Sequence, residues 1–183
     1  MLLHEQVFII HRQSVKQLLA RFLNGSSSLI IIDFPSFKKA NLEAVTALKS
    51  FCADLLAILD QAGQPLTITS KTVQSPPSLA GLLLSYPSIY YTEDPTSKVL
   101  DAEVAVFSVH TDSKVPRTLM QFSSPPGFVE TIRTQLKETV KEWECRSRQL
   151  SPALSKRWCS YTGVESCTLK IQIETRKVPI LSL

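Results

Sequence analysis

The run of aliphatic residues from Leu29 to Ile32, closed by Asp33, constrains the fold of this chain more than any other stretch. Three of its four aliphatic residues are β-branched, and serines and a proline flank it, which predicts a strand that is apolar on both faces. Such a strand needs cover on both sides. Helical patterns precede it over Ser14 to Leu23 and follow it over Leu42 to Ala62. We therefore predict an α/β fold, a three-layer sandwich with this strand in its interior.

The order of the apolar segments predicts the topology of the sheet. Strands expected at Val7–Ile10, Leu29–Asp33 and Leu66–Ser70 alternate with the two helices, and this order favours parallel strands. Later, Ala102–His110 and Thr118–Phe122 follow each other closely, which is typical of an antiparallel hairpin. We predict a mixed, mostly parallel central sheet with an antiparallel C-terminal part, in a single α/β domain over residues 1–183.

Two amphipathic patterns occupy the last third of the chain. From Pro125 to about Arg148 a long helix is expected, with its apolar stripe formed by Val129, Ile132, Leu136, Val140 and Trp143. A row of basic residues at intervals of four follows another line on the same helix: Arg133, Lys137 and Lys141. Residues 169–174 alternate apolar and polar side chains, the period of a strand with one wet face.

The basic row and the net charge of +4 are the features that bear on nucleic-acid binding. Basic side chains at this spacing can contact phosphates. Glutamates at 130, 138, 142 and 144 dilute the row, and mixed charge is typical of a solvated helix face. We therefore favour an unknown protein partner over nucleic acid, and expect no membrane contact because no apolar run approaches the length of a membrane span.

The four cysteines, Cys52, Cys145, Cys159 and Cys167, indicate the compartment. None forms a C-x-x-C pair, and no histidine lies near enough to suggest a zinc site, so we expect no metal. Free thiols and the absence of a signal-peptide pattern at Met1 favour a reducing, cytoplasmic location. The alternative is a Cys159–Cys167 disulfide in a secreted chain.

Candidate chemistry is restricted to a few polar residues near the ends of predicted strands. Asp33 and Ser36 follow the buried strand, and His110 and Asp112 end a later one. In open α/β sheets, ligand sites gather at the carboxyl ends of strands. The alternative for Asp33 is an aspartate that caps its own turn before Pro35. No G-x-S-x-G motif supports a hydrolase, and five glycines form neither a dinucleotide-binding loop nor a phosphate loop, so we expect no cofactor.

Several sequence blocks resemble those of a eukaryotic family known by its gene's location, the chromosome 1 open reading frame 74 family. The blocks are residues 29–33, Gly81-Leu82-Leu83-Leu84-Ser85-Tyr86-Pro87, Leu119-Met120-Gln121-Phe122-Ser123, Trp143-Glu144 and Val178-Pro179-Ile180-Leu181. Ser85 departs from the family pattern, which has a glycine before Tyr-Pro. The resemblance also implies a β-α unit before Val7, without which we expect an exposed sheet edge and self-association.

The family resemblance implies a domain of unknown function and carries over no catalytic residue. Two functional hypotheses remain open from the sequence. The first is a non-catalytic intracellular binding or scaffold protein. The alternative is an enzyme of unknown reaction class, with its site at the strand ends around Asp33.

Overall fold

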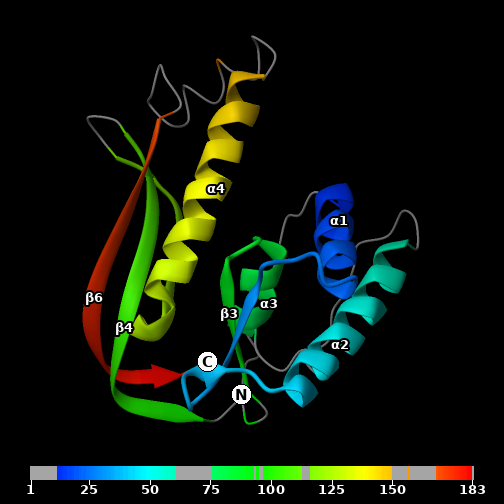
Figure 1. The fold of residues 1–183 in the computed structure, drawn as a ribbon, viewed down its shortest axis with the longest axis vertical. Helices are drawn as coiled ribbons and strands as arrows, with labels where there is room; N and C mark the ends of the chain where they lie inside the picture. Colours follow the sequence, from blue (N-terminus) through cyan, green and yellow to red (C-terminus); the bar gives the residue numbers. More distant parts are fainter. Residues whose placement is uncertain are drawn as a thin grey trace, which may run out of the picture. The chain divides into compact units, whose positions relative to one another are not determined.

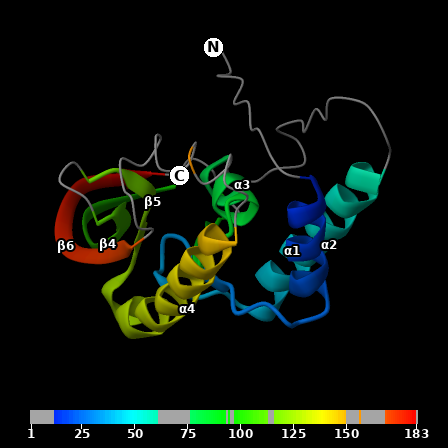
Figure 2. The same ribbon diagram turned by 90° about the horizontal axis from the view of Figure 1, so that it is seen from above.

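The computed structural model describes residues 12–60, 76–92, 94, 97–112, 116–149, 156 and 168–182. They belong to two compact units, Met1–Ser97 with Leu183 and Lys98–Ser182, which are described separately below (Figures 1 and 2). The strands predicted at Val7–Ile10 and Leu66–Ser70 lie outside the described residues. That the two units form a single domain with three layers stays a prediction.

The first unit is a small mixed sheet with helices. Its elements are α1 (Arg12–Leu23), β1 (Ile30–Asp33), β2 (Lys38–Lys39), α2 (Leu42–Asp60), α3 (Pro76–Leu83) and β3 (Ser88–Tyr91). The strand order is β2-β1-β3. β1 is parallel to β3 and antiparallel to β2, so β1 lies between the other two described strands of this sheet.

The core of the first unit confirms the prediction of a buried strand. Ile31 of β1 lies beside Ile89 of β3 on one face of the sheet, and both belong to a single buried cluster with side chains of all three helices. Leu19 of α1 and Leu59 of α2 have no exposed surface in that cluster. Ile32, which alternates to the other face, is also fully buried, as expected for a strand that is apolar on both sides.

The start of α2 and the end of α1 are closed by the usual capping interactions. Asn41 is the N-cap of α2, because its Oδ1 accepts a hydrogen bond from the Ala44 N–H at 2.8 Å. α1 ends with Gly25 at φ 76°, and its last turn is closed by the Gly25 N–H to Phe22 O bond and the Ser26 N–H to Arg21 O bond. This pair of bonds defines a Schellman motif with a left-handed residue just after the helix.

α3 ends in the same motif, but with serine in the left-handed position. Ser85 has φ 59°, its N–H donates to Leu82 O at 3.2 Å, and the Tyr86 N–H donates to Gly81 O at 2.8 Å. Ser85 therefore occupies the one position of this turn that favours glycine.

Gly81 allows α3 to approach β3 closely. A Cβ on Gly81 would lie 2.9 Å from Cγ2 of Ile89, nearer than side-chain carbons pack. α3 and β3 are thus held together at a distance that only a glycine permits at this point.

The second unit is antiparallel throughout. Its elements are β4 (Lys98–Thr111), β5 (Thr118–Ser124), the 3₁₀ turn η1 (Pro126–Phe128), α4 (Val129–Arg148) and β6 (Leu169–Ser182), with strand order β5-β4-β6. Figure 1 shows α4 running beside the curved pair of β4 and β6. The Leu169 N–H at the start of β6 donates to Glu144 Oε1 of α4 at 2.9 Å.

The apolar side chains of the second unit follow the expected periods. Phe107 and Val109 of β4 lie on one face, and Phe107 stacks on Phe122 of β5 with ring centroids 5.1 Å apart. In α4, Ile132 and Leu136 have no exposed surface, which confirms the predicted apolar stripe. Both the sheet and the helix of this unit therefore carry fully buried apolar side chains.

The described strands do not support the prediction of a mostly parallel central sheet. The described strands form two three-stranded sheets, and β1 with β3 is their one parallel pair. After β1 the chain turns back through β2, and the segment from Thr111 to Thr118 is too short for the crossover that parallel neighbours need. The predicted mixture of α and β elements and the antiparallel C-terminal part are confirmed.

Candidate functional site

The carboxyl end of β1 brings together two of the candidate residues, Asp33 and Ser36. The Ser36 hydroxyl donates a hydrogen bond to Asp33 Oδ2, and the Phe37 N–H donates to the Asp33 carbonyl at 2.9 Å. Ser36 Oγ also accepts from the Lys38 N–H at 3.4 Å. These contacts close the turn between β1 and β2, so the carboxylate holds its own turn, as the alternative for Asp33 anticipated.

Aromatic rings surround this turn. Phe34 is 2 % exposed and meets Phe37 and Tyr90 edge-to-face, each with ring centroids 5.9 Å apart. Phe37 has φ 58°, a left-handed conformation that is uncommon for a bulky residue. At the end of β1, the hydrogen-bonded carboxylate of Asp33 and hydroxyl of Ser36 therefore belong to a turn that also holds packed aromatic rings.

The other two candidates, His110 and Asp112, do not pair with each other through any contact that the structure gives. Nδ1 of His110 lies 3.2 Å from Thr118 Oγ1, and the enclosed Nε2 has no hydrogen-bond partner among the described residues. Asp112 forms an ion pair with Lys170 at 2.8 Å. Within the described part of the chain, no carboxylate is hydrogen-bonded to this histidine in the way that orients a general base.

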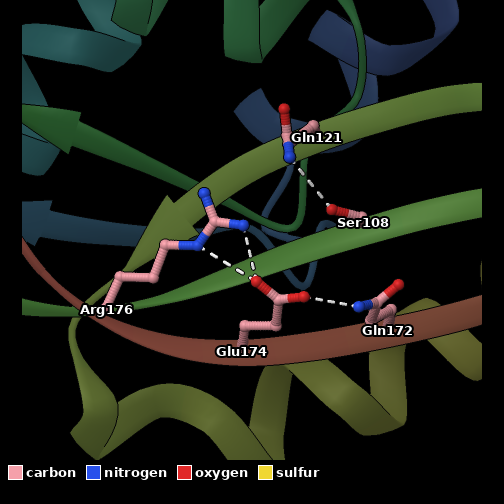
Figure 3. Close-up of polar contacts among 5 residues, drawn as sticks. All are labelled: Ser108, Gln121, Gln172, Glu174 and Arg176. Carbon is pink, nitrogen blue, oxygen red and sulfur yellow. Dashed lines mark hydrogen bonds and ion pairs between the residues drawn. The ribbon is translucent and has the colours of Figure 1, made fainter.

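A third group of residues, which the sequence revealed only in part, lies on one face of the β5-β4-β6 sheet. Figure 3 shows its members side by side on three strands: Ser108, Gln121, Gln172, Glu174 and Arg176. We call this set the polar sheet face. Because Ser108 is opposite both Gln121 and Gln172 in the strand registers, all these side chains point to the same side of the sheet.

Hydrogen bonds and one ion pair connect the polar sheet face. Gln121 Nε2 donates to Ser108 Oγ at 3.2 Å, and Gln172 Nε2 donates to Glu174 Oε1. Arg176 Nε donates to Glu174 Oε2 at 3.0 Å. Hydrogen bonding from the Arg176 guanidinium, followed by its charge, lowers the pKa of Glu174 from its ordinary value, so this carboxylate is ionised near neutral pH.

Arg133, one member of the basic row of α4, has a local acidic partner. Arg133 pairs with Glu130 at 3.0 Å, and farther along the helix Arg146 pairs with Glu142 at the i, i+4 spacing. Lys137 and Lys141 are exposed. This mixture of charges is that of a solvated helix face.

The described cysteines differ in reactivity. Cys52 is fully buried in α2, and desolvation by burial raises the pKa of its thiol to about 12, which makes it a poor nucleophile. Cys145 is a free, exposed thiol. Cys159 and Cys167, and with them the alternative of a disulfide, lie outside the described residues.

Two further properties concern metals and membranes. Nowhere in the described segments do three or more His, Cys, Asp or Glu side chains gather as they would around a metal ion. Each described helix is too short or too polar to cross a lipid bilayer.

Comparison with known proteins identifies a family. No curated protein and no solved structure matched the chain. A family model did match, and it covers residues 1–176, nearly the whole sequence. It spans both compact units, from α1 to the middle of β6. The chain therefore belongs to the family described as Domain of unknown function (DUF4504).

Proposed function

We propose that this protein is a non-catalytic binding or scaffold protein whose contact surface is the polar sheet face. The observation that supports this proposal is the combination of lateral bonding and exposure on that face. Gln121, Gln172 and Arg176 are exposed while hydrogen bonds to neighbouring side chains hold two of the amides and the guanidinium in place. Side chains held in this way lose less conformational entropy when a partner binds.

The charge on this face indicates the class of partner. Arg176 is neutralised by Glu174, and the two glutamines are neutral donors and acceptors. Such a surface suits hydrogen bonding to a polar protein surface. A phosphate backbone would instead require several cations without acidic partners. We therefore propose a protein partner.

The test compares two sets of substitutions in tagged protein. The first set is Gln121→Ala, Gln172→Ala and Arg176→Ala on the polar sheet face. The matched control is the alanine triple variant of the basic row on α4, at Arg133, Lys137 and Lys141. We expect proteins captured by the wild type to be lost with the first set and kept with the control, and the affinity of a purified captured protein to follow the same order.

The opposite outcome would contradict the proposal. If the first set keeps every partner and the α4 set loses it in a salt-sensitive manner, the basic row is the binding surface and nucleic acid is the partner.

The alternative proposal is an enzyme with its site at Asp33. What supports it is that Asp33 ends β1 beside the parallel strand β3, and that Ser36 donates to its carboxylate. Incubating the purified protein with a mixture of cell metabolites should then deplete one of them. Asp33→Asn should abolish that depletion and leave thermal unfolding nearly unchanged, whereas a depletion that Asp33→Asn does not alter would exclude Asp33.

Two further assignments belong with this proposal. We propose a cytoplasmic location, because the free thiol of the exposed Cys145 suits a reducing compartment. We also propose the narrower assignment to the chromosome 1 open reading frame 74 family, which the sequence blocks between residues 29 and 181 support.

A further inference from the structure

The strand β6 lies at an edge of the second sheet, where another strand could add. β6 has 14 residues and pairs with β4 along its whole length, from Lys98 opposite Ser182 to Thr111 opposite Leu169. The strand order is β5-β4-β6, so no described strand occupies the other side of β6. Long edge strands are sites where another strand can add to a sheet.

The direction of the backbone groups of β6 follows from one hydrogen bond. The Asp112 N–H donates to Thr168 O at 2.9 Å, in the same register that places Thr111 opposite Leu169. Because backbone groups alternate with a period of two, the even-numbered residues of β6 face β4 and the odd-numbered ones face outward. Ile173, Thr175 and Lys177 therefore direct their N–H and C=O groups away from β4.

Symmetry restricts how two copies of β6 can pair. A two-fold axis perpendicular to the sheet places the same face of both copies on the same side. Opposed residues must then both be even or both be odd, and one residue lies opposite itself on the axis. Since β6 runs from Leu169 to Ser182, full overlap of two copies requires that this residue lie near the middle of the strand.

Three registers place a central residue of β6 on the axis, namely Glu174, Thr175 or Arg176. The charges of Glu174 and Arg176 favour one of the three. With Glu174 on the axis, the two Glu174 carboxylates are opposed, and with Arg176 on the axis the two guanidinium groups are opposed. Like charges directly opposite each other destabilise a pair of strands. With Thr175 on the axis, Glu174 of each copy lies opposite Arg176 of the other, and both ion pairs are favourable.

We propose that two copies of this chain pair antiparallel through β6, with Thr175 on the two-fold axis. The outward N–H and C=O groups of the two Thr175 residues then bond to each other, and the same exchange repeats on both sides except at Pro179, which has no N–H. The two polar sheet faces become continuous. Lys177 and Pro179 are residues of the kind that protect edges from indiscriminate pairing, and they leave this register intact.

The first experiment removes one outward backbone donor. Thr175→Pro deletes an N–H that the sheet of the single copy does not use, and Thr175→Val is the matched control that keeps it. Sedimentation of the full chain over a wide concentration range should show reversible dimers for the wild type and Thr175→Val, and loss of dimers for Thr175→Pro. Circular dichroism confirms that each variant is folded.

The second experiment uses charge and does not depend on proline. Glu174→Arg opposes arginine to arginine across the axis, and Arg176→Glu opposes glutamate to glutamate, so each variant alone should dimerise at least about tenfold more weakly. An equal mixture of the two variants should dimerise again, because every arginine then lies opposite a glutamate of the other copy. Loss of the Glu174–Arg176 contact within one copy could not be repaired by mixing.

Two results would overturn the proposal. One is a wild-type chain that sediments as a monomer at all concentrations tested. The other is a dimer that Thr175→Pro leaves intact and whose affinity does not change when the two charge variants are mixed. Thr175→Pro alters no member of the polar sheet face, so this variant tests pairing at the edge of β6 separately from what that face binds.

Discussion

Exchanging the left-handed residues at the ends of α1 and α3 should change stability in opposite directions. Ser85→Gly removes a left-handed strain of about 1–2 kcal/mol, and the greater freedom of glycine in the unfolded chain returns about 0.5–1 kcal/mol. The net gain is about 0.5–1 kcal/mol in the free energy of unfolding. Ser85 is exposed and its hydroxyl makes no hydrogen bond within the described residues, so the substitution removes no contact.

Gly25→Ser is the reciprocal change. Its φ of 76° carries the same cost for serine, and a Cβ at this position would meet nothing within 4 Å, so the backbone alone determines the loss. For a chain of this size the two variants should shift the melting temperature by about 1–4 °C, upward for Ser85→Gly and downward for Gly25→Ser. The double variant should return close to the wild type, because the two turns are separate and their effects add.

Urea and thermal unfolding measured by circular dichroism test this pair of variants. If Ser85→Gly leaves the protein no more stable, or Gly25→Ser leaves it no less stable, the two turns do not hold left-handed residues in solution. The reasoning from the left-handed backbone at Gly25 and Ser85 would then be refuted.

Further substitutions test the packing and the thiols. Gly81→Ala should lower the free energy of unfolding by about 1 kcal/mol, because crowding against Ile89 exceeds the gain in helix propensity. A Cβ at Gly127 would lie in open space, so Gly127→Ala should change the free energy of unfolding by less than about 0.5 kcal/mol. Urea unfolding measures both variants. Alkylation at pH 8 followed by mass spectrometry should label Cys145 well before Cys52, whose buried thiol has a pKa of about 12, and equal rates would contradict that burial. Ile31→Asp places a charge at a site 5 % exposed and should abolish soluble expression; recovery of soluble, cooperatively folding protein would show that β1 is not interior.

Local features of the fold could be predicted because local residues determine them. The uninterrupted aliphatic run predicted the buried β1, the helical pattern from Leu42 predicted α2, and the stripe on α4 predicted its buried side. The partners of the strands could not be predicted in the same way. Periodicity indicates that a segment is extended but not which distant segment it pairs with, so the pairing of β4 with β6 could not be predicted. β2, with two lysines, has no apolar signal at all.

The sequence predicted only the part of the polar sheet face that β6 contributes. Alternation over residues 169–174 indicated a wet face for β6, and that face carries Gln172 and Glu174. The contributions of Ser108 and Gln121 depend on strand register, which residue patterns do not encode. His110 and Asp112 suggested a pair because they are two residues apart, yet Asp112 lies just past the end of β4, where it meets Lys170.

The register between β4 and β6 has a consequence for how the chain folds while it is being synthesised. Roughly 60 residues separate the end of β4 at Thr111 from the start of β6 at Leu169, so a ribosome adding about 5–20 residues per second needs about 3–12 seconds to deliver the second strand. During that interval β5 can pair with one side of β4, while the other side presents backbone groups and the buried side chains of Val104 and Phe107 without their final neighbour. The first unit, whose elements all precede β4, can complete its fold in the meantime. The nascent second unit is therefore the part of this protein that chaperones at the ribosome would be expected to hold.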